Sequence, residues 1–113
     1  MKIENAKAQM KKGILEMCIL SIISAEGEAY PSDMIQRLKE YDLIVVEGTL
    51  YPLLTRLKND GYLGYTWQES RTGPPRKYYQ VTPSGVAFLS ELMEAWAQLV
   101  STVHQTTKTI NHE

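Results

Sequence analysis

The chain has 113 residues, 43% of them apolar, which is enough for one domain with a modest core but not for two. Its 12 Lys and Arg residues nearly balance 13 Asp and Glu residues, so the net charge of −1 neither excludes nor favours a polyanionic partner. No stretch approaches roughly 18 consecutive apolar residues, which excludes a membrane-spanning helix, and the Lys-rich start has no apolar signal core. Cys18 is the single cysteine and excludes an intrachain disulfide. We therefore expect a cytoplasmic protein without a membrane partner.

The first two predicted elements are helices. Apolar residues nearly encircle the second half of residues 6–25, which predicts a helix buried on more than one side, and Gly27 is suited to end it with a left-handed cap. A second helix is expected to start with Ser32 as its N-cap and to end near Tyr41. Residues 43–46 form a short strand or an extended connector.

A third helix is predicted from about Glu47 or Thr49 to Asp60. Because a proline deep inside a helix loses a hydrogen bond and clashes with the preceding turn, we expect Pro52 within or next to the first turn. Leucines at spacings of three and four should face the core, namely Leu50, Leu53, Leu54 and Leu57. The polar or basic side chains on the other faces are candidate DNA contacts, namely Thr49, Tyr51, Thr55, Arg56 and Lys58. Tyr51 could also be a core residue.

The next segment predicts a basic β-hairpin. Residues 63–69 and 76–81 are rich in aromatic residues with partial alternation, and turn formers connect them. One tyrosine of the Tyr78-Tyr79 pair should lie in the core. The candidate phosphate contacts are Arg71, Arg76 and Lys77. A helix beside a basic hairpin is suited to duplex DNA, with the helix in the major groove and the hairpin along the phosphates. The alternative is an ordinary amphipathic helix beside a solvated charged turn.

The last predicted element is a helix of more than 20 residues that starts with a hydroxyl cap and proline at Thr82-Pro83. It carries an apolar stripe with alternating steps of three and four, as in a coiled coil. A domain of this size cannot bury the stripe alone, so we expect a second copy to cover it. The expected dimer contacts are Leu89, Leu92, Trp96, Leu99, Val103 and Ile110. The expected domains are residues 1–81 for DNA binding and residues 82–113 for dimerisation.

In this order, the segments resemble a winged-helix DNA-binding domain of the PadR family of bacterial transcription regulators. The resemblance extends from about Gly13 to Ile110. The residues that carry it are Gly48-Thr49-Leu50-Tyr51-Pro52-Leu53-Leu54, Arg56-Leu57, Asp60-Gly61, Gly73-Pro74-Pro75-Arg76-Lys77-Tyr78-Tyr79 and Val81-Thr82-Pro83-Ser84-Gly85. A short chain with one long last helix is similar to the compact branch of the family.

The resemblance implies a homodimeric repressor that binds a double-stranded DNA operator with dyad symmetry. Its third helix would enter the major groove, its hairpin would be the wing and its last helix would dimerise. Small molecules such as phenolic acids or drugs relieve repression in some members. Trp96 falls where PadR-like multidrug sensors carry a tryptophan in the pocket at the dimer interface. Met10 and Met93 could line an adaptable pocket with it, although Trp96 could instead only fill the dimer core.

The expected fold is therefore mainly α with a small antiparallel β-hairpin, a winged helix-turn-helix followed by a long dimerisation helix. We expect no metal, since His104 and His112 lack a second ligand pair at metal spacing, and no cofactor or enzymatic activity, since no catalytic arrangement stands out. Two other functions stay open. One is a winged-helix module for protein–protein assembly, and the other is a multidrug-binding protein with an aromatic pocket at the dimer interface.

Overall fold

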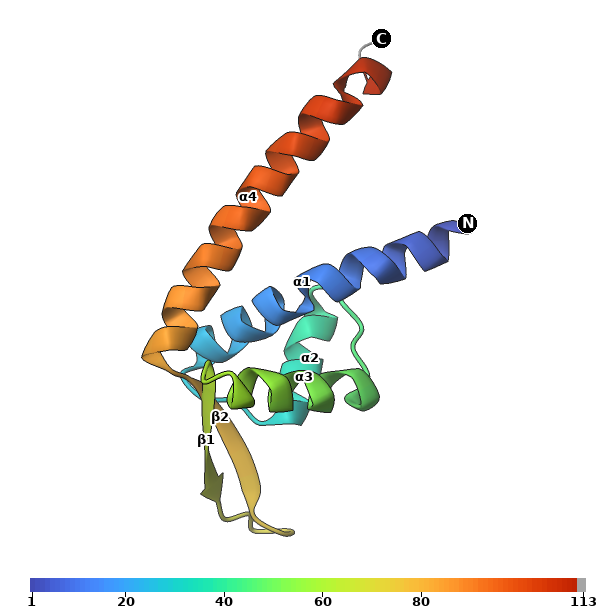
Figure 1. Ribbon diagram of the computed structural model, residues 1–113. Helices are drawn as coiled ribbons and strands as arrows, with labels where there is room; N and C mark the ends of the chain where they lie inside the picture. Colours follow the sequence, from blue (N-terminus) through green and yellow to red (C-terminus); the bar gives the residue numbers. More distant parts are fainter. Residues whose placement is uncertain (112–113) are drawn as a thin grey trace.

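The computed structural model describes the backbone of residues 1–111 and the side chains of residues 1–108. The helices and strands, in chain order, are α1 (Ile3–Glu26), α2 (Pro31–Glu40), α3 (Glu47–Asn59), β1 (Leu63–Gln68), β2 (Arg76–Val81) and α4 (Pro83–Asn111). Figure 1 shows α2 and α3 packed under α1, with the hairpin projecting on the far side from α4. The predicted fold class is confirmed.

The core forms where α1, α2 and α3 meet. The largest side chains with almost no exposed surface come from all three helices, namely Ile19, Leu20, Ile23, Met34, Leu50, Leu54 and Leu57. Burying each such side chain contributes roughly 2 kcal/mol to folding. Leu53 is buried with them, so the expectation that the leucine face of α3 points to the core is confirmed.

One predicted helix start needs correction. Helix α2 begins at Pro31 and its N-cap is Tyr30, which makes no side-chain cap hydrogen bond, so Ser32 is inside the helix rather than at its cap. Proline explains this start because its ring presets a helical φ and it lacks the N–H that a cap would satisfy. Residues 43–46 form an extended connector rather than a strand.

Pro52 lies in the second turn of α3, because the helix already begins at Glu47. This position is next to the first turn, as expected. The hydrogen bond that Pro52 cannot donate would have gone to the carbonyl of Gly48. Gly48 is exposed, so water can satisfy this carbonyl, and the cost of the proline stays small.

The hairpin is antiparallel and its base is tied to the helices. Leu63 pairs with Val81, Tyr65 with Tyr79 and Trp67 with Lys77. Tyr79 also exchanges two backbone hydrogen bonds with Ala29, between α1 and α2, at N···O distances of 2.9 and 3.1 Å. Its side chain is only 6% exposed, which confirms that one tyrosine of the Tyr78-Tyr79 pair belongs to the core.

The start of helix α4 packs against the core, and the rest of the helix extends away from it. We call residues 1–95 the body. The Thr82 hydroxyl oxygen accepts a hydrogen bond from the Gly85 N–H at 3.0 Å, which confirms the predicted cap. Leu89 and Leu92 pack partly buried against the core. From Trp96 to Val103 the large apolar side chains are exposed, and α4 diverges from α1 as one side of an open V (Figure 1). We call residues 96–108 the α4 arm.

Candidate nucleic-acid interface

A groove of about 290 Å³ lies between α3 and the hairpin, beside the start of α2. Four predicted DNA contacts line it together, namely Tyr51 and Thr55 from α3 and Arg76 and Lys77 from β2. Sequence reasoning missed the other residues that line it, which are Tyr30, Pro31, Trp67, Pro75 and Tyr79. We call this the α3–hairpin groove.

Aromatic rings support both cations of the groove. The Arg76 guanidinium lies 4.7 Å from the centre of the Tyr30 ring. The Lys77 ammonium lies 4.4 Å from the centre of the Tyr65 ring and 5.3 Å from that of Trp67. Among the described residues, neither cation has an acidic side chain within ion-pair distance. The two charges are therefore held in place and available to an anionic ligand.

The Tyr51 and Thr55 hydroxyl groups of α3 differ in whether they are free to donate a hydrogen bond. Tyr51 is 45% exposed, and burial, followed by the nearby Glu47 carboxylate and Tyr30, raises the pKa of its phenol above the ordinary value. The Tyr51 hydroxyl therefore keeps its proton near neutral pH and can donate it to a phosphate oxygen. The Thr55 hydroxyl donates to the Tyr51 carbonyl at 3.1 Å, so it must rotate to do the same.

The remaining predicted DNA contacts lie outside this groove. Arg56 projects from another side of α3 and donates to a Glu16 carboxylate oxygen on α1 at 2.8 Å. Lys58 lies 5.9 Å from the centre of the Tyr65 ring. Thr49, in the first turn of α3, and Arg71, in the hairpin loop, are both exposed.

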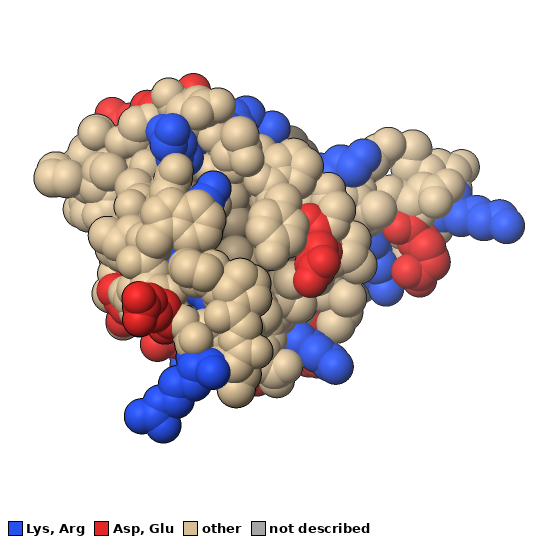
Figure 2. Space-filling view, turned by 90° about the horizontal axis from the view of Figure 1, so that it is seen from below, with Lys and Arg blue, Asp and Glu red and all other residues tan. Residues whose placement is uncertain are grey.

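Charge on the face that carries the hairpin is scattered. Figure 2 shows lysine and arginine side chains at several places on this face, some within it and some at its edge, with acidic side chains among them. A polyanion would therefore be held by individual cations set in the groove rather than by one continuous basic patch.

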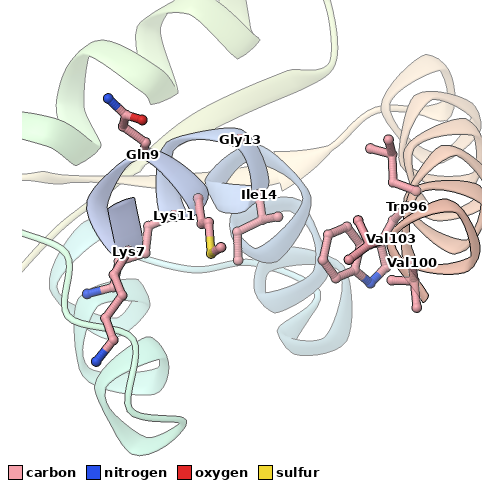
Figure 3. Close-up of a pocket in the computed structure, with 10 residues that line it drawn as sticks. Lys7, Gln9, Lys11, Gly13, Ile14, Trp96, Val100 and Val103 are labelled. Carbon is pink, nitrogen blue, oxygen red and sulfur yellow. The ribbon is translucent and has the colours of Figure 1, made fainter. Parts of the chain in front are cut away.

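A second groove, of about 730 Å³, lies between α1 and the α4 arm, and we call it the α1–α4 groove. Figure 3 shows the Trp96 ring pointing from α4 toward α1. The groove is also lined by Leu99, Val100 and Val103 from α4 and by Lys7, Gln9, Met10, Lys11, Gly13 and Ile14 from α1. The expected effector residues Trp96 and Met10 thus share one groove, whereas Met93 is exposed and does not line it.

The predicted dimer contacts fall into two groups in the structure. Trp96, Leu99 and Val103 line the α1–α4 groove, whereas Leu89 and Leu92 are turned partly into the core of their own chain. Ile110 belongs to α4, but its side chain lies outside the described residues.

None of the helices within residues 1–111 has the length and apolar character needed to cross a membrane. In the same part of the chain, His, Cys, Asp and Glu side chains form no group of three or more that could hold a metal ion. Cys18 is half-buried, and burial raises the pKa of its thiol, which disfavours the reactive thiolate.

Three helices with an antiparallel hairpin beside the third define a winged helix-turn-helix, a class of DNA-binding fold. A family model, the transcriptional regulator PadR-like family, matches residues 19–91, and the chain belongs to this family. Its members are transcriptional regulators rather than enzymes, which implies that this chain binds DNA.

Individual relatives agree with this assignment. A PadR-like transcription factor from Bacteroides fragilis is 59% identical, with 90% of this chain and 98% of that chain covered and a TM-score of 0.76. A PadR family regulator from Eggerthella lenta is 29% identical, with 95% and 93% covered and a TM-score of 0.88. A transcriptional regulator from Mycobacterium tuberculosis is 36% identical over 80 residues, which are 71% of this chain and 74% of that protein. The predicted family is confirmed.

Proposed function

We propose that this regulator is a homodimeric repressor that grips operator DNA with the α3–hairpin groove. The observation that carries the proposal is the convergence of Tyr51, Thr55, Arg76 and Lys77 on one groove. Two cations and two hydroxyl groups are the donors that phosphate oxygens accept. With phosphates held between α3 and the hairpin, the exposed face of α3 enters the major groove and contacts base edges.

The α4 arm supports a dimer. Leu99 and Val103 line the α1–α4 groove, yet they are 58% and 57% exposed, so α1 of the same chain does not cover them. A contiguous apolar stripe of this kind marks an interaction site, and a second copy supplies a matching stripe by symmetry. In this proposal residues 1–81 bind DNA, residues 82–113 dimerise, and the pair acts in the cytoplasm, where an operator lies.

The dimer has consequences for the operator. Two copies of α3 related by a two-fold axis require half-sites of dyad symmetry about one helical turn apart. Each phosphate that the protein neutralises releases counterions, so affinity falls steeply as salt increases. A footprint without dyad symmetry, or affinity that does not depend on salt, contradicts this model.

The direct test is the double variant Arg76→Ala/Lys77→Ala. A duplex selected by the wild-type protein from a random pool should bind on the order of 100-fold more weakly at fixed salt. The slope of log affinity against log salt should become shallower by about 2 per protomer, because two phosphate contacts are lost. The matched control is Lys2→Ala/Lys12→Ala, which removes the same charge from two exposed residues that do not line the groove. Sedimentation should show that both variants remain dimers.

The same variant separates DNA binding from the alternative of a protein-assembly module. Wild-type affinity for DNA in the Arg76→Ala/Lys77→Ala variant would contradict the phosphate-gripping role. A wild-type protein that selects no duplex from the pool would favour the alternative, in which the exposed face of α3 is a docking surface for another protein.

We also propose that a small planar aromatic compound relieves repression by binding the α1–α4 groove. Support comes from the Trp96 ring, which faces α1 across this groove, and from Met10, which also lines it. The chain has 2 tryptophans, so a Trp67→Phe variant reports on Trp96 alone. Titrated aromatic compounds should quench its fluorescence and release the operator over the same concentration range. Quenching without release would make this a drug-binding site unconnected to DNA binding and would contradict the regulatory role.

A further inference from the structure

The end of α3 and the start of α4 share one short piece of backbone. Gly61, at a φ of +85°, ends α3 in the left-handed conformation that glycine tolerates best. The Gly61 N–H donates to the Lys58 carbonyl at 3.0 Å, and the Tyr62 N–H donates to the Leu57 carbonyl at 2.9 Å. These bonds satisfy carbonyl groups in the last turn of α3.

The carbonyl groups of the same two residues accept hydrogen bonds from the start of α4. The Thr82 N–H donates to the Tyr62 carbonyl at 3.1 Å, and the Thr82 hydroxyl donates to the Gly61 carbonyl at 2.6 Å. The Ser84 hydroxyl adds a bond to the Gly61 carbonyl at 3.3 Å. Because the Thr82 hydroxyl also caps α4, one side chain both starts α4 and fastens it to the end of α3.

Gly85 allows the close approach between these segments. A Cβ atom on Gly85 would overlap the Tyr62 carbonyl oxygen and lie 2.7 Å from a Val81 methyl group. The oxygen is backbone and cannot move aside as a flexible side chain could. One turn further along α4, the Phe88 ring stacks on the Tyr62 ring, with 4.1 Å between centroids and 3° between planes. We call residues 61–62 and 82–88 the α3–α4 joint.

We propose that the α3–α4 joint sets the separation of operator half-sites that the dimer accepts, with Gly85 and Phe88 as its positioning residues. This inference rests on the proposed dimer. The α4 arms fix the position of the two-fold axis, and α3 carries the surface that enters the major groove. The joint connects these two parts, so its angle determines how far apart the two copies of α3 stand.

A small change at the joint has a large effect because the arm is long. From Gly85 to Val103, α4 extends about 27 Å at 1.5 Å per residue. A rotation of about 10° at the joint therefore displaces α3 relative to the middle of the arm by about 5 Å. That displacement exceeds the rise of one base pair, about 3.4 Å, and the second copy doubles it. If the joint bent by this amount, the dimer would bind half-sites at the wrong spacing.

The test uses the full-length dimer and the duplex selected by the wild-type protein from a random pool. Derivatives of this duplex carry one or two base pairs inserted or deleted between the half-sites. The wild-type protein should bind each derivative at least about 10-fold more weakly than the parent, because both copies of α3 can no longer enter their grooves. Gly85→Ala should move the preferred spacing by one base pair or more. The control Gly64→Ala adds a methyl group to a strand glycine with open space around it and should keep the wild-type preference.

Phe88→Leu tests the joint if Gly85→Ala does not fold. This variant removes the ring stack and leaves the backbone approach intact, so it should broaden the spacing preference to less than about 3-fold discrimination. A variant that is only destabilised would lose affinity for all spacings equally, and that result overturns the proposal, as does a wild-type preference in both variants. A wild-type protein that selects no duplex contradicts the proposed function itself.

Discussion

The body of the molecule and the α4 arm carry similar apolar side chains, but only the body buries them. Leu54 of α3 has no exposed surface, whereas Leu99 of the arm is 58% exposed, although both belong to regular apolar stripes on helices. The difference lies in the neighbours that the chain itself supplies. We therefore interpret the body as a folding unit and the arm, in the proposed dimer, as an assembly unit. Substitutions in the body should lower stability, whereas substitutions in the arm should prevent dimerisation.

The largest effect should come from charges placed in the arm. Leu99→Asp/Val103→Asp puts carboxylates into the expected interface, where desolvation costs several kcal/mol. We expect a monomer in sedimentation experiments, with operator affinity reduced on the order of 1,000-fold and the circular dichroism spectrum of a folded body.

The matched control is Ala97→Asp/Ser101→Asp, which adds the same charges on α4 away from the α1–α4 groove. It should remain a dimer. Dissociation of this control, or persistence of the dimer in the Leu99→Asp/Val103→Asp variant, would count against the arm as the interface.

A cavity created in the core of the body should lower the stability of the fold rather than prevent dimerisation. In the monomeric Leu99→Asp/Val103→Asp background, Leu54→Ala should lower the free energy of unfolding by about 3 kcal/mol, because it removes buried atoms and leaves a cavity. Urea denaturation measures this change. Val100→Ala, a truncation in the arm, should cost less than about 0.5 kcal/mol in the same background. Equal losses for the two variants would remove the distinction between body and arm.

A smaller effect is expected within the α3–hairpin groove. Trp67 is 61% exposed and lies beside the Lys77 ammonium. Trp67→Ala removes this support, worth about 1 kcal/mol, and should weaken operator binding about 5-fold without changing the dimer. Fluorescence anisotropy with a labelled duplex measures the change. Tyr41→Ala, which truncates another exposed aromatic residue outside the groove, should leave affinity unchanged.

The smallest effect concerns pH and the base of the hairpin. Burial, followed by the neighbouring Tyr65 and Tyr51, raises the pKa of the Tyr79 phenol in the folded protein. The folded state therefore holds this proton more tightly than the unfolded state, whose phenol titrates near pH 10. The resulting stabilisation is complete below about pH 10 and is lost as pH rises through the folded pKa.

Tyr79→Phe removes this titration. The Tm of the variant should decline less steeply above about pH 10 than that of the wild-type protein. Tyr41→Phe, at an exposed position, should retain the wild-type slope. An identical slope for the Tyr79 variant would show that the phenol does not contribute to the alkaline loss of stability.

Much of the fold could be predicted because its signals are local. Leucine spacing defined the buried face of α3, and the Thr82-Pro83 pair marked the start of α4. The error at Ser32 arose because an N-cap depends on the exact residue where a helix begins. Helix termini are decided by caps and neighbours that a short sequence window does not specify.

The site was harder to predict because its residues come together through tertiary contacts. Nothing near Arg56 in the sequence indicates its ion pair with Glu16, 40 residues away on α1. Tyr30 reaches the groove only because the chain reverses between α1 and α2. Trp67, in contrast, could have been found, since an antiparallel register that starts with Leu63 opposite Val81 places it across from Lys77.

The paired hydrogen bonds between Ala29 and Tyr79 have a mechanical consequence for the hairpin. They extend the two-stranded ribbon by a third short segment at its root, whereas the loop at residues 70–75 gains no such attachment. The hairpin is thus anchored at its base beside α1 and unattached at its tip. Amide hydrogen exchange should accordingly be slow at Tyr79 and rapid in the loop, with the tip free to follow local variation in the shape of the duplex.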